Sequence, residues 1–225
     1  IIRWQQNNAK MKKIMTYSMI HDIKTPLSTI RLGLGALDHE RIANDSEKRT
    51  KYLQVISTET QHAYSLINRI LTISKSQAGK LELKKVQVDM TSMLSKMEEN
   101  FRVNRLKNVS FENHINCQYA FADEEYLKEI FYNLIDNSIK YSDGDVTIRI
   151  STDKVDKGVS IRVRDNGIGI SKADQKVIFD KYERASAAKR TFKKKGAPGF
   201  GLGLTYVFQV IDAHEGMIGV ESELG

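Results

Sequence analysis

The sequence predicts two domains of different classes, a helical hairpin followed by an α+β two-layer sandwich. Through about residues 8–80 the apolar positions recur at helical spacing, with one proline and little strand-like alternation. Beyond residue 84, strand-like and helix-like segments interleave at uneven spacing, which favours one sheet covered on one face by helices. A chain of 225 residues is also long for a single compact core. We therefore expect domains at residues 1–83 and 84–225.

The first domain is expected to contain two long helices that pack lengthwise. Apolar residues from Ile23 to Leu37 step by alternating fours and threes, and those from Tyr52 to Ile73 keep the same rhythm. The segment DHERIANDSEKR between them is polar and turn-like. One hairpin has too narrow an apolar stripe for a core of its own, so dimerisation into a four-helix bundle is expected.

The second domain is expected to begin after Gly79, where the helical rhythm breaks and LELKKVQVDM turns to strand-like alternation. The remaining elements are predicted from the spacing of their apolar residues. Strands are expected near residues 109, 119, 145, 159 and 217, and helices over about 90–106, 123–141, 171–181 and 202–214.

Composition indicates a globular chain, with 40% hydrophobic and 28% charged residues. No apolar run approaches the roughly 20 residues that span a bilayer, so we expect no membrane contact from this chain. The single cysteine, Cys117, fits a reducing compartment. The net charge of +7 comes without a recognisable nucleic-acid-binding motif, so phosphate ligands are expected and nucleic acid is not. The basic cluster at 189–195 suits that role, or that of a solvated loop, about equally.

His21 lies in the helical segment SMIHDIKTPLSTI, about 200° around the helix from Ile23 of the apolar stripe, so its imidazole should face solvent. An exposed neutral imidazole is a nucleophile near neutral pH, and Asp22 could accept its proton. A lone surface histidine is most often inert. However, Pro26 in a patterned helix costs about 3 kcal/mol, which suggests that function constrains this segment.

Two asparagines, Asn133 and Asn137, lie one helical turn apart in EIFYNLIDNSIKYS, with Lys140 and Tyr141 just beyond. Nucleotide-bound Mg²⁺ takes only one or two protein oxygens beside phosphates and waters, and two stacked amide oxygens suit that role. For one asparagine alone, a buried or capping role is the stronger alternative.

The segment DNGIGI follows an alternating strand. Asp165 could accept a hydrogen bond from the adenine amine, while Gly167 and Gly169 would let the backbone approach a planar base. The alternative is an ordinary hairpin turn.

Further phosphate ligands are expected in IFDKYERA and in GAPGFGLGL. Lys181 and Arg184 are candidates, although solvated charges at a helix end would look the same. Glycine-rich backbone that opens a helix makes an anion site, because unpaired amides and the helix dipole face the phosphates. The strict alternation of Gly199, Gly201 and Gly203 fits neither the dinucleotide fingerprint nor a P-loop.

In order and spacing these segments resemble the sensor histidine kinases of two-component signalling, over nearly the whole chain. HDIKTPL resembles the phosphoacceptor box, NLIDNSIKYS the asparagine box, DNGIGI the first glycine box, IFDKYERA the phenylalanine box and GFGLGL the second glycine box. The resemblance implies a Bergerat-type ATP-binding domain, the fold shared with gyrase, the Hsp90 chaperone and MutL. The family usually continues beyond VESELG, so the second domain is expected to lack its final strand.

The resemblance also implies a role for each site residue. His21 would accept the phosphoryl group from ATP, Asp22 would assist its deprotonation, and Thr25 would position water for a phosphatase reaction. Asn133 and Asn137 would hold Mg²⁺ and phosphates, and Asp165 would bind the adenine amine. The other nucleotide contacts would be Lys140, Tyr141, Gly167, Gly169, Lys181, Tyr182, Arg184, Gly199, Gly201, Leu202, Gly203 and Leu204.

The implied partners are a second copy of the chain and the receiver domain of a response regulator. The chain lacks an initiating Met and is expected to be a cytoplasmic fragment, whose parent protein would be anchored in the bacterial inner membrane. Two alternatives stay open: a GHKL-type ATPase, and a non-catalytic scaffold of the same fold. The ATPases have Glu where this chain has Asn133. Asp22, Lys24 and Tyr182 depart conservatively from the family pattern.

Overall fold

The computed structural model describes residues 2–39, 42, 44–102, 108–176, 178–179 and 202–224. Two compact units are present, one built on residues 1–77 and the other on residues 78–180 and 203–225. The last helix of the first unit ends at Gln77 and the first strand of the second begins at Lys85. The predicted boundary at 83/84 falls between them and remains a proposal. In the described part of the chain, no helix is long and apolar enough to span a membrane.

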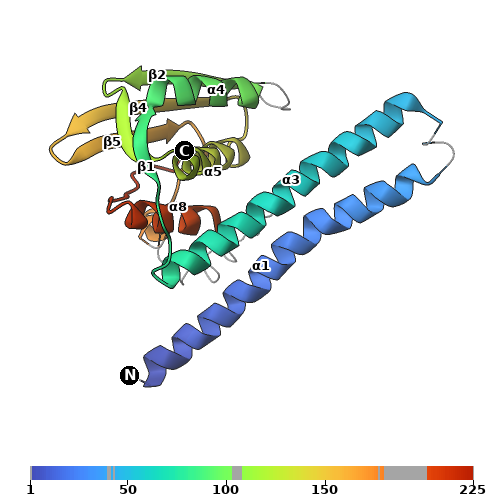
Figure 1. Ribbon diagram of the computed structural model, residues 1–225, viewed down its shortest axis with the longest axis horizontal. Coiled ribbons are helices and arrows are strands. Elements are labelled where there is room, and N and C mark those ends of the chain that lie inside the picture. The colour runs from blue at the N-terminus through green and yellow to red at the C-terminus, as the bar shows by residue number, and fades with distance from the viewer. Residues whose placement is uncertain are drawn as a thin grey trace. The chain divides into compact units, whose positions relative to one another are not determined.

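The first unit is a hairpin of α1 (Ile2–Leu37) and α3 (Ser46–Gln77), which lie side by side and antiparallel in Figure 1. The helices approach closely at Gly33, where a Cβ would lie 2.9 Å from Cγ1 of Ile56. Asp45 precedes α3 and accepts a hydrogen bond from the Lys48 amide at 3.1 Å, as an N-capping side chain does. The two expected long helices are confirmed.

The described residues of the second unit form five strands, grouped by their hydrogen bonds into two sheets. In one sheet β1 pairs antiparallel with β3, and in the other β4 lies between a parallel β2 and an antiparallel β5. The expectation of one sheet is therefore wrong in detail: β3 contacts β5, but the described residues show no paired register between them. Alternation predicts which side chains are buried and not which strands pair. The strands are β1 (Lys85–Asp89), β2 (Val109–Ile115), β3 (Tyr119–Asp123), β4 (Val146–Val155) and β5 (Gly158–Asp165).

Two amphipathic helices, α4 (Met90–Arg102) and α5 (Glu124–Lys140), contact these strands and enclose the core (Figure 1). Both helices contribute side chains to that core, which confirms the α+β character of the unit. The helix α8 (Leu202–Ala213) buries a further set on its inner face. The most deeply buried side chains include Met90, Leu94, Phe131, Ile135, Ile148, Ile150, Tyr206, Val207 and Val210.

Two expected elements differ in the structure. The strand expected near 217 does not form. The Ser222 hydroxyl accepts a hydrogen bond from Ile170 N and its carbonyl accepts one from Gln175 Nε2, so this segment bonds to the end of the DNGIGI loop and to the short helix after it, and not to a strand edge. The helix expected over 171–181 is shorter in the described residues, where α6 covers only Lys172–Gln175. Such a short helix is stabilised by tertiary bonds, here those of Gln175, which sequence periodicity does not report.

Candidate functional site

His21 is exposed on α1, as its position relative to the apolar stripe predicted. Its side chain keeps 63% of its accessible surface, and Nδ1 lies 3.7 Å from Oδ1 of Asp22. A carboxylate on the Nδ1 side favours the tautomer that carries its proton there. The lone pair of Nε2, the distal nitrogen, is then the nucleophilic position.

One turn further along α1, Thr25 is also exposed. Its Oγ1 donates a hydrogen bond to the His21 carbonyl at 3.3 Å. The helix continues through Pro26, which is buried and has no amide to offer the carbonyl of Asp22 four residues earlier. The three residues predicted to act at the phosphoacceptor site, His21, Asp22 and Thr25, thus lie within consecutive turns of one helix.

Asn133 and Asn137 meet the start of α8. Asn133 is buried and its Nδ2 donates to the Glu129 carbonyl at 2.7 Å, which leaves Oδ1 as the acceptor of that amide. A Cβ on Gly203 would lie 3.0 Å from Asn133 Oδ1 and 4.0 Å from Asn137 Nδ2. The absence of a side chain at Gly203 therefore lets the two helices approach at the asparagines.

Asp165 ends β5, and both of its carboxylate oxygens are engaged. Oδ1 accepts the Gly167 amide at 2.9 Å and Oδ2 accepts the Ser138 hydroxyl at 3.0 Å. The same hydroxyl lies 3.0 Å from the Leu134 carbonyl. The Ser138 hydroxyl has one proton for these two acceptors. It donates preferentially to the ionised Asp165 carboxylate, because a charged acceptor makes the stronger hydrogen bond.

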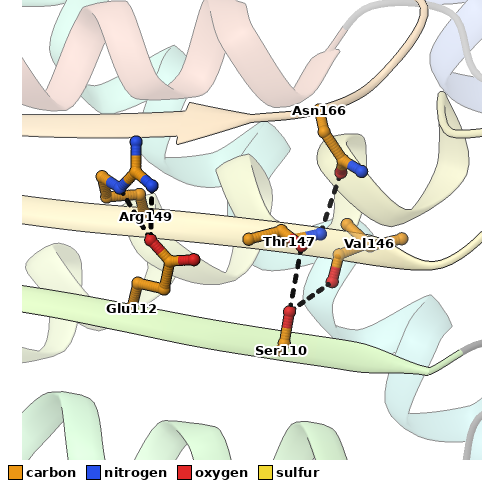
Figure 2. Close-up of polar contacts among 6 residues, drawn as sticks. All are labelled: Ser110, Glu112, Val146, Thr147, Arg149 and Asn166. Carbon is orange, nitrogen blue, oxygen red and sulfur yellow. Dashed lines mark hydrogen bonds and ion pairs between the residues drawn. The ribbon is translucent and has the colours of Figure 1, made fainter.

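The DNGIGI loop is fixed to the end of α5 and to β4. The Ile168 amide donates to the Tyr141 carbonyl at 3.0 Å, and the Asn166 side chain accepts the Thr147 amide at 2.8 Å. Figure 2 shows the Asn166 amide reaching Thr147 on β4. Through these bonds β5, β4 and α5 together set the position of Asp165.

The two glycines of this loop each have a local structural reason. A Cβ at Gly167 would lie 2.8 Å from Asp165 Oδ1 and 2.9 Å from the Tyr141 carbonyl. Gly169 has φ of +73°, and a Cβ there would lie 1.8 Å from the Glu223 carbonyl. Neither position can accept a larger residue without a shift of backbone.

Lys140 and Tyr141 follow the asparagines at the C-terminal end of α5. The Lys140 ammonium lies 5.4 Å from the centroid of the Tyr141 ring, within cation–π range. The structure thus brings together most of the predicted nucleotide contacts that it describes: Asn133, Asn137, Lys140, Tyr141, Asp165, Gly167, Gly169 and Gly203. Leu204 follows Gly203 on α8 and is half-buried.

Several predicted contacts lie outside the described residues. The candidates in the phenylalanine box and the second glycine box are Lys181, Tyr182, Arg184, Gly199 and Gly201, together with the basic cluster at 189–195 and the side chain of Leu202.

The side-chain amide oxygens of Asn133 and Asn137 are suitable ligands for a cation that is already bound to phosphates. Across the described residues there is no group of three or more His, Cys, Asp or Glu able to hold a metal ion. Two amide oxygens supply hard ligands without charge, which fits nucleotide-bound Mg²⁺ better than a site made by the protein alone.

Sequence reasoning missed Ser138, whose hydroxyl orients Asp165. The available signal was a serine inside a helix, a position that serine does not favour unless its hydroxyl finds a partner. It also missed Asn166, which gives no sequence signal beyond its place in the turn.

Two family models match the chain. A model described as "His Kinase A (phospho-acceptor) domain" matches residues 11–79, and one described as "Histidine kinase-, DNA gyrase B-, and HSP90-like ATPase" matches residues 122–225. The first range contains His21, and the second contains every nucleotide contact proposed above.

Curated relatives match along nearly the whole chain. Sensor protein RprX of Bacteroides fragilis is 31% identical over 100% of this chain and 43% of its own length. Sensor histidine kinase WalK of Bacillus subtilis is 28% identical over 97% of this chain and 36% of its own. The chain therefore spans less than half the length of either relative.

Solved structures support the fold. Histidine kinase AdeS of Acinetobacter baumannii matches with a TM-score of 0.59 and 22% identity, over 86% of each chain. Full-length ShkA, solved in complex with AMPPNP, matches with a TM-score of 0.61 and 23% identity, over 95% of this chain and 43% of that one.

Proposed function

Since this chain belongs to the sensor histidine kinases of two-component signalling, we propose that it transfers the γ-phosphoryl group of ATP to His21 and then to an aspartate of a response-regulator receiver domain. The resemblance drawn from the motifs is thereby confirmed at the level of the family. The activity, the residues and the partners are our proposal.

The observation that carries the proposal is the exposed His21 with Asp22 beside Nδ1. With its proton at Nδ1, the imidazole attacks through the Nε2 lone pair: a P–N bond forms, the bond between the γ-phosphorus and the bridging oxygen breaks, and ADP leaves. Positive charge develops on the ring during attack, and the Asp22 carboxylate stabilises it and can accept the Nδ1 proton.

The nucleotide is held by the second unit. Asp165 accepts the adenine amine with lone pairs that Ser138 and Gly167 leave available. Phosphates are contacted by Lys140, Lys181, Arg184 and the second glycine box. Asn133 and Asn137 would hold nucleotide-bound Mg²⁺, which neutralises charge on the transferred phosphoryl group. AMPPNP in the ShkA complex, an ATP analogue, supports this assignment by fold.

The wider assembly is part of the same proposal. The hairpin pairs with a second copy to form a four-helix bundle, and the receiver domain docks at the surface around His21, where Thr25 positions water for a phosphatase reaction. The reaction takes place in the cytoplasm, where ATP is present. The parent protein is anchored in the bacterial inner membrane.

A GHKL-type ATPase is the alternative from another class. Its hydrolysis needs a general base to activate water, and the Asn133 amide that occupies this position cannot accept a proton as a carboxylate does. The other alternative, a non-catalytic scaffold, predicts no turnover of ATP at all.

The proposal is tested by incubating the chain with radiolabelled ATP and assaying for acid-labile, base-stable phosphate. His21→Gln should abolish the label and keep ATP affinity, because the two sites lie in different units. His62→Gln is the matched control: this exposed histidine also has a carboxylate 3.7 Å from Nδ1, that of Glu59, but lies outside the phosphoacceptor segment. Label that persists in His21→Gln or disappears in His62→Gln would refute the assignment. ATP hydrolysis without protein labelling would favour the ATPase.

A further inference from the structure

His214 lies just beyond α8 and makes hydrogen bonds to two other elements. Its Nε2 accepts the Asp123 amide at 3.0 Å, and its Nδ1 lies 2.8 Å from the Val210 carbonyl. Its own carbonyl is 3.5 Å from the Lys85 ammonium of β1. Asp123 is the N-cap of α5, and its carboxylate accepts the amides of Tyr126 and Lys84.

The two contacts of the ring, with Asp123 and Val210, define the tautomer of the imidazole. The Val210 carbonyl can only accept, so Nδ1 must carry a proton, and the Asp123 amide can only donate, so Nε2 must offer a lone pair. Only the neutral Nδ1–H tautomer satisfies both neighbours. The imidazole therefore bridges a carbonyl of α8 and the amide at the N-cap of α5.

The helix α8 thus meets α5 near both of its own ends. Gly203 in its first turn abuts Asn133, and His214 after its last turn bonds to Asp123. At about 1.5 Å per residue, the α8 segment from Gly203 to His214 is about 16 Å long, and the α5 segment from Asp123 to Asn133 is about 15 Å long. The two contacts are therefore separated by similar distances along both helices, which run antiparallel between them.

We propose that His214 is a positioning residue of the nucleotide site, holding α8 in register with α5 so that Gly203 and the asparagines keep their mutual placement. At Gly203 there is little room for adjustment, because a Cβ there would already be within 3.0 Å of Asn133 Oδ1. A helix released at its far end would shift at this contact. The inference rests on the proposed function, since it assigns His214 to the site that binds ATP.

Three substitutions separate positioning from stability. His214→Gln can place an amide oxygen where Nε2 lies and accept the Asp123 amide, whereas His214→Asn keeps only a donor near Nδ1 and His214→Ala keeps neither. Thr152→Val is the control: Thr152 is fully buried in β4 and its hydroxyl donates to the Cys117 carbonyl at 2.8 Å, away from α8. Thermal unfolding of each variant gives its melting temperature, so that the His214 variants can be compared with Thr152→Val at similar stability.

Labelling of His21 is then measured against ATP concentration. We expect KM for ATP to rise about tenfold or more in His214→Ala and His214→Asn with kcat within about threefold, and His214→Gln to stay within about threefold in both. Thr152→Val should leave KM unchanged even when it lowers the melting temperature. Wild-type KM in His214→Ala and His214→Asn, or a loss in His214→Gln as large as in His214→Ala, would overturn the proposal.

A spectroscopic measurement on the unaltered chain needs no variant to fold. Nitrogen-15 NMR of the imidazole without nucleotide should show the Nδ1–H tautomer, and an ATP analogue should shift the Asp123 amide and the His214 ring signals. An Nε2–H tautomer would overturn the inference. A chain that shows the Nδ1–H tautomer but binds no ATP would refute the proposed function, and with it the role of His214 in that function. This result differs from the Nε2–H tautomer, which would refute the role of His214 alone.

Discussion

At the scale of single residues, Asp165 illustrates how the protein itself orients a proposed nucleotide contact. The Gly167 amide and the Ser138 hydroxyl each hold one carboxylate oxygen, so the group is fixed in rotation before any ligand is considered. A carboxylate oxygen has two lone pairs, and each still has one to offer. Orientation by Ser138 should therefore contribute to affinity for adenine.

Ser138→Ala is expected to weaken ATP binding about tenfold, or roughly 1.4 kcal/mol, because the carboxylate loses a charge-assisted hydrogen bond and rotates more freely. Calorimetric titration with an ATP analogue measures this. Ser110→Ala is the control, since that hydroxyl also bonds within the unit but on β2, to the Val146 carbonyl and the Thr147 hydroxyl (Figure 2). Equal affinities in both variants and the wild type would show that Ser138 has no part in the site.

Thr25 allows the two proposed activities of the phosphoacceptor helix to be separated. Transfer from ATP to His21 needs no hydroxyl at this position, whereas hydrolysis of an acyl phosphate needs a positioned water. We expect Thr25→Ala to keep His21 labelling within a few-fold, about 1 kcal/mol at most, and to lower dephosphorylation of the receiver domain much further. Both rates are measured on one preparation with a phosphorylated response regulator.

The control for that comparison is Thr29→Ala. Its hydroxyl makes the same contact one turn on, a hydrogen bond to the carbonyl four residues earlier at 3.3 Å. If Thr25→Ala and Thr29→Ala change both rates alike, Thr25 serves only the helix.

Whether a site residue could be predicted depended on how far its contacts lie from it along the sequence. Asn133 and Asn137 share one helix face, and Asp165 ends an alternating strand, so local pattern was enough to single them out. Ser138 and Asp165 are 27 residues apart, and Asp123 and His214 are 91 apart. Pairings over such distances depend on how the helices and strands pack, which no local pattern specifies.

At the scale of elements, the C-terminal end of α8 is closed by a residue in an unfavourable conformation. Glu215 has φ of +63°, and the Gly216 amide donates to the Ile211 carbonyl at 2.9 Å, the hydrogen bond of a Schellman motif. A residue with a side chain costs about 1–2 kcal/mol in this left-handed region, where glycine is preferred. The helix ends here despite that cost.

Glu215→Gly is accordingly expected to stabilise the second unit by about 1 kcal/mol and to raise its melting temperature by about 2–4 °C. Thermal unfolding followed by circular dichroism measures the shift. Glu215→Ala keeps the Cβ and removes the charge, so it should not reproduce the gain. A glycine variant that melts lower than the wild type would contradict this account.

The start of α4 gives a prediction about pH. The pKa of Asp89 is lowered chiefly by the hydrogen bond from the Ser92 amide, with a further contribution from the Gln118 side chain. Since the pKa of Asp89 in the folded protein lies below its ordinary value of 3.8, the ionised carboxylate with its hydrogen bond from Ser92, which caps the start of α4, stabilises the fold above pH 3.8. This contribution is lost as the pH falls through the lowered pKa. Carboxyl NMR should give an Asp89 midpoint below 3.8, and a midpoint at or above it would contradict the cap.

Long elements were the most predictable part of the fold. The helical hairpin and α5 follow from periodicity, because many apolar positions agree. The strand expected near 217 was wrong because Ser222 bonds to Ile170 and Gln175, which lie outside any strand. The five described strands form two paired groups where one sheet was expected. Alternation alone contains neither kind of information.

At the scale of the whole molecule, the hairpin leaves part of its apolar stripe uncovered. Leu27 and Leu34 on α1 remain 52% and 53% exposed, although they adjoin the buried Pro26 and Gly33 in successive heptads. Completing the burial of one such leucine contributes about 1 kcal/mol, so a row of them favours a second copy. A phosphoacceptor-type domain of this family is also expected to dimerise.

Leu27→Glu combined with Leu34→Glu is therefore expected to convert the chain from a dimer of twice 25.6 kDa to a monomer in sedimentation equilibrium. Placing two carboxylates in an apolar seam costs their hydration in addition to the lost contacts. Leu32→Glu is the control: it is 71% exposed on the same helix but lies about 160° from Leu34 and about 140° from Leu27 around the axis, so it should leave the dimer intact. A wild-type monomer at all concentrations would refute the bundle. A dimer that survives both leucine changes while Leu32→Glu dissociates it would instead place the seam on the opposite face of α1.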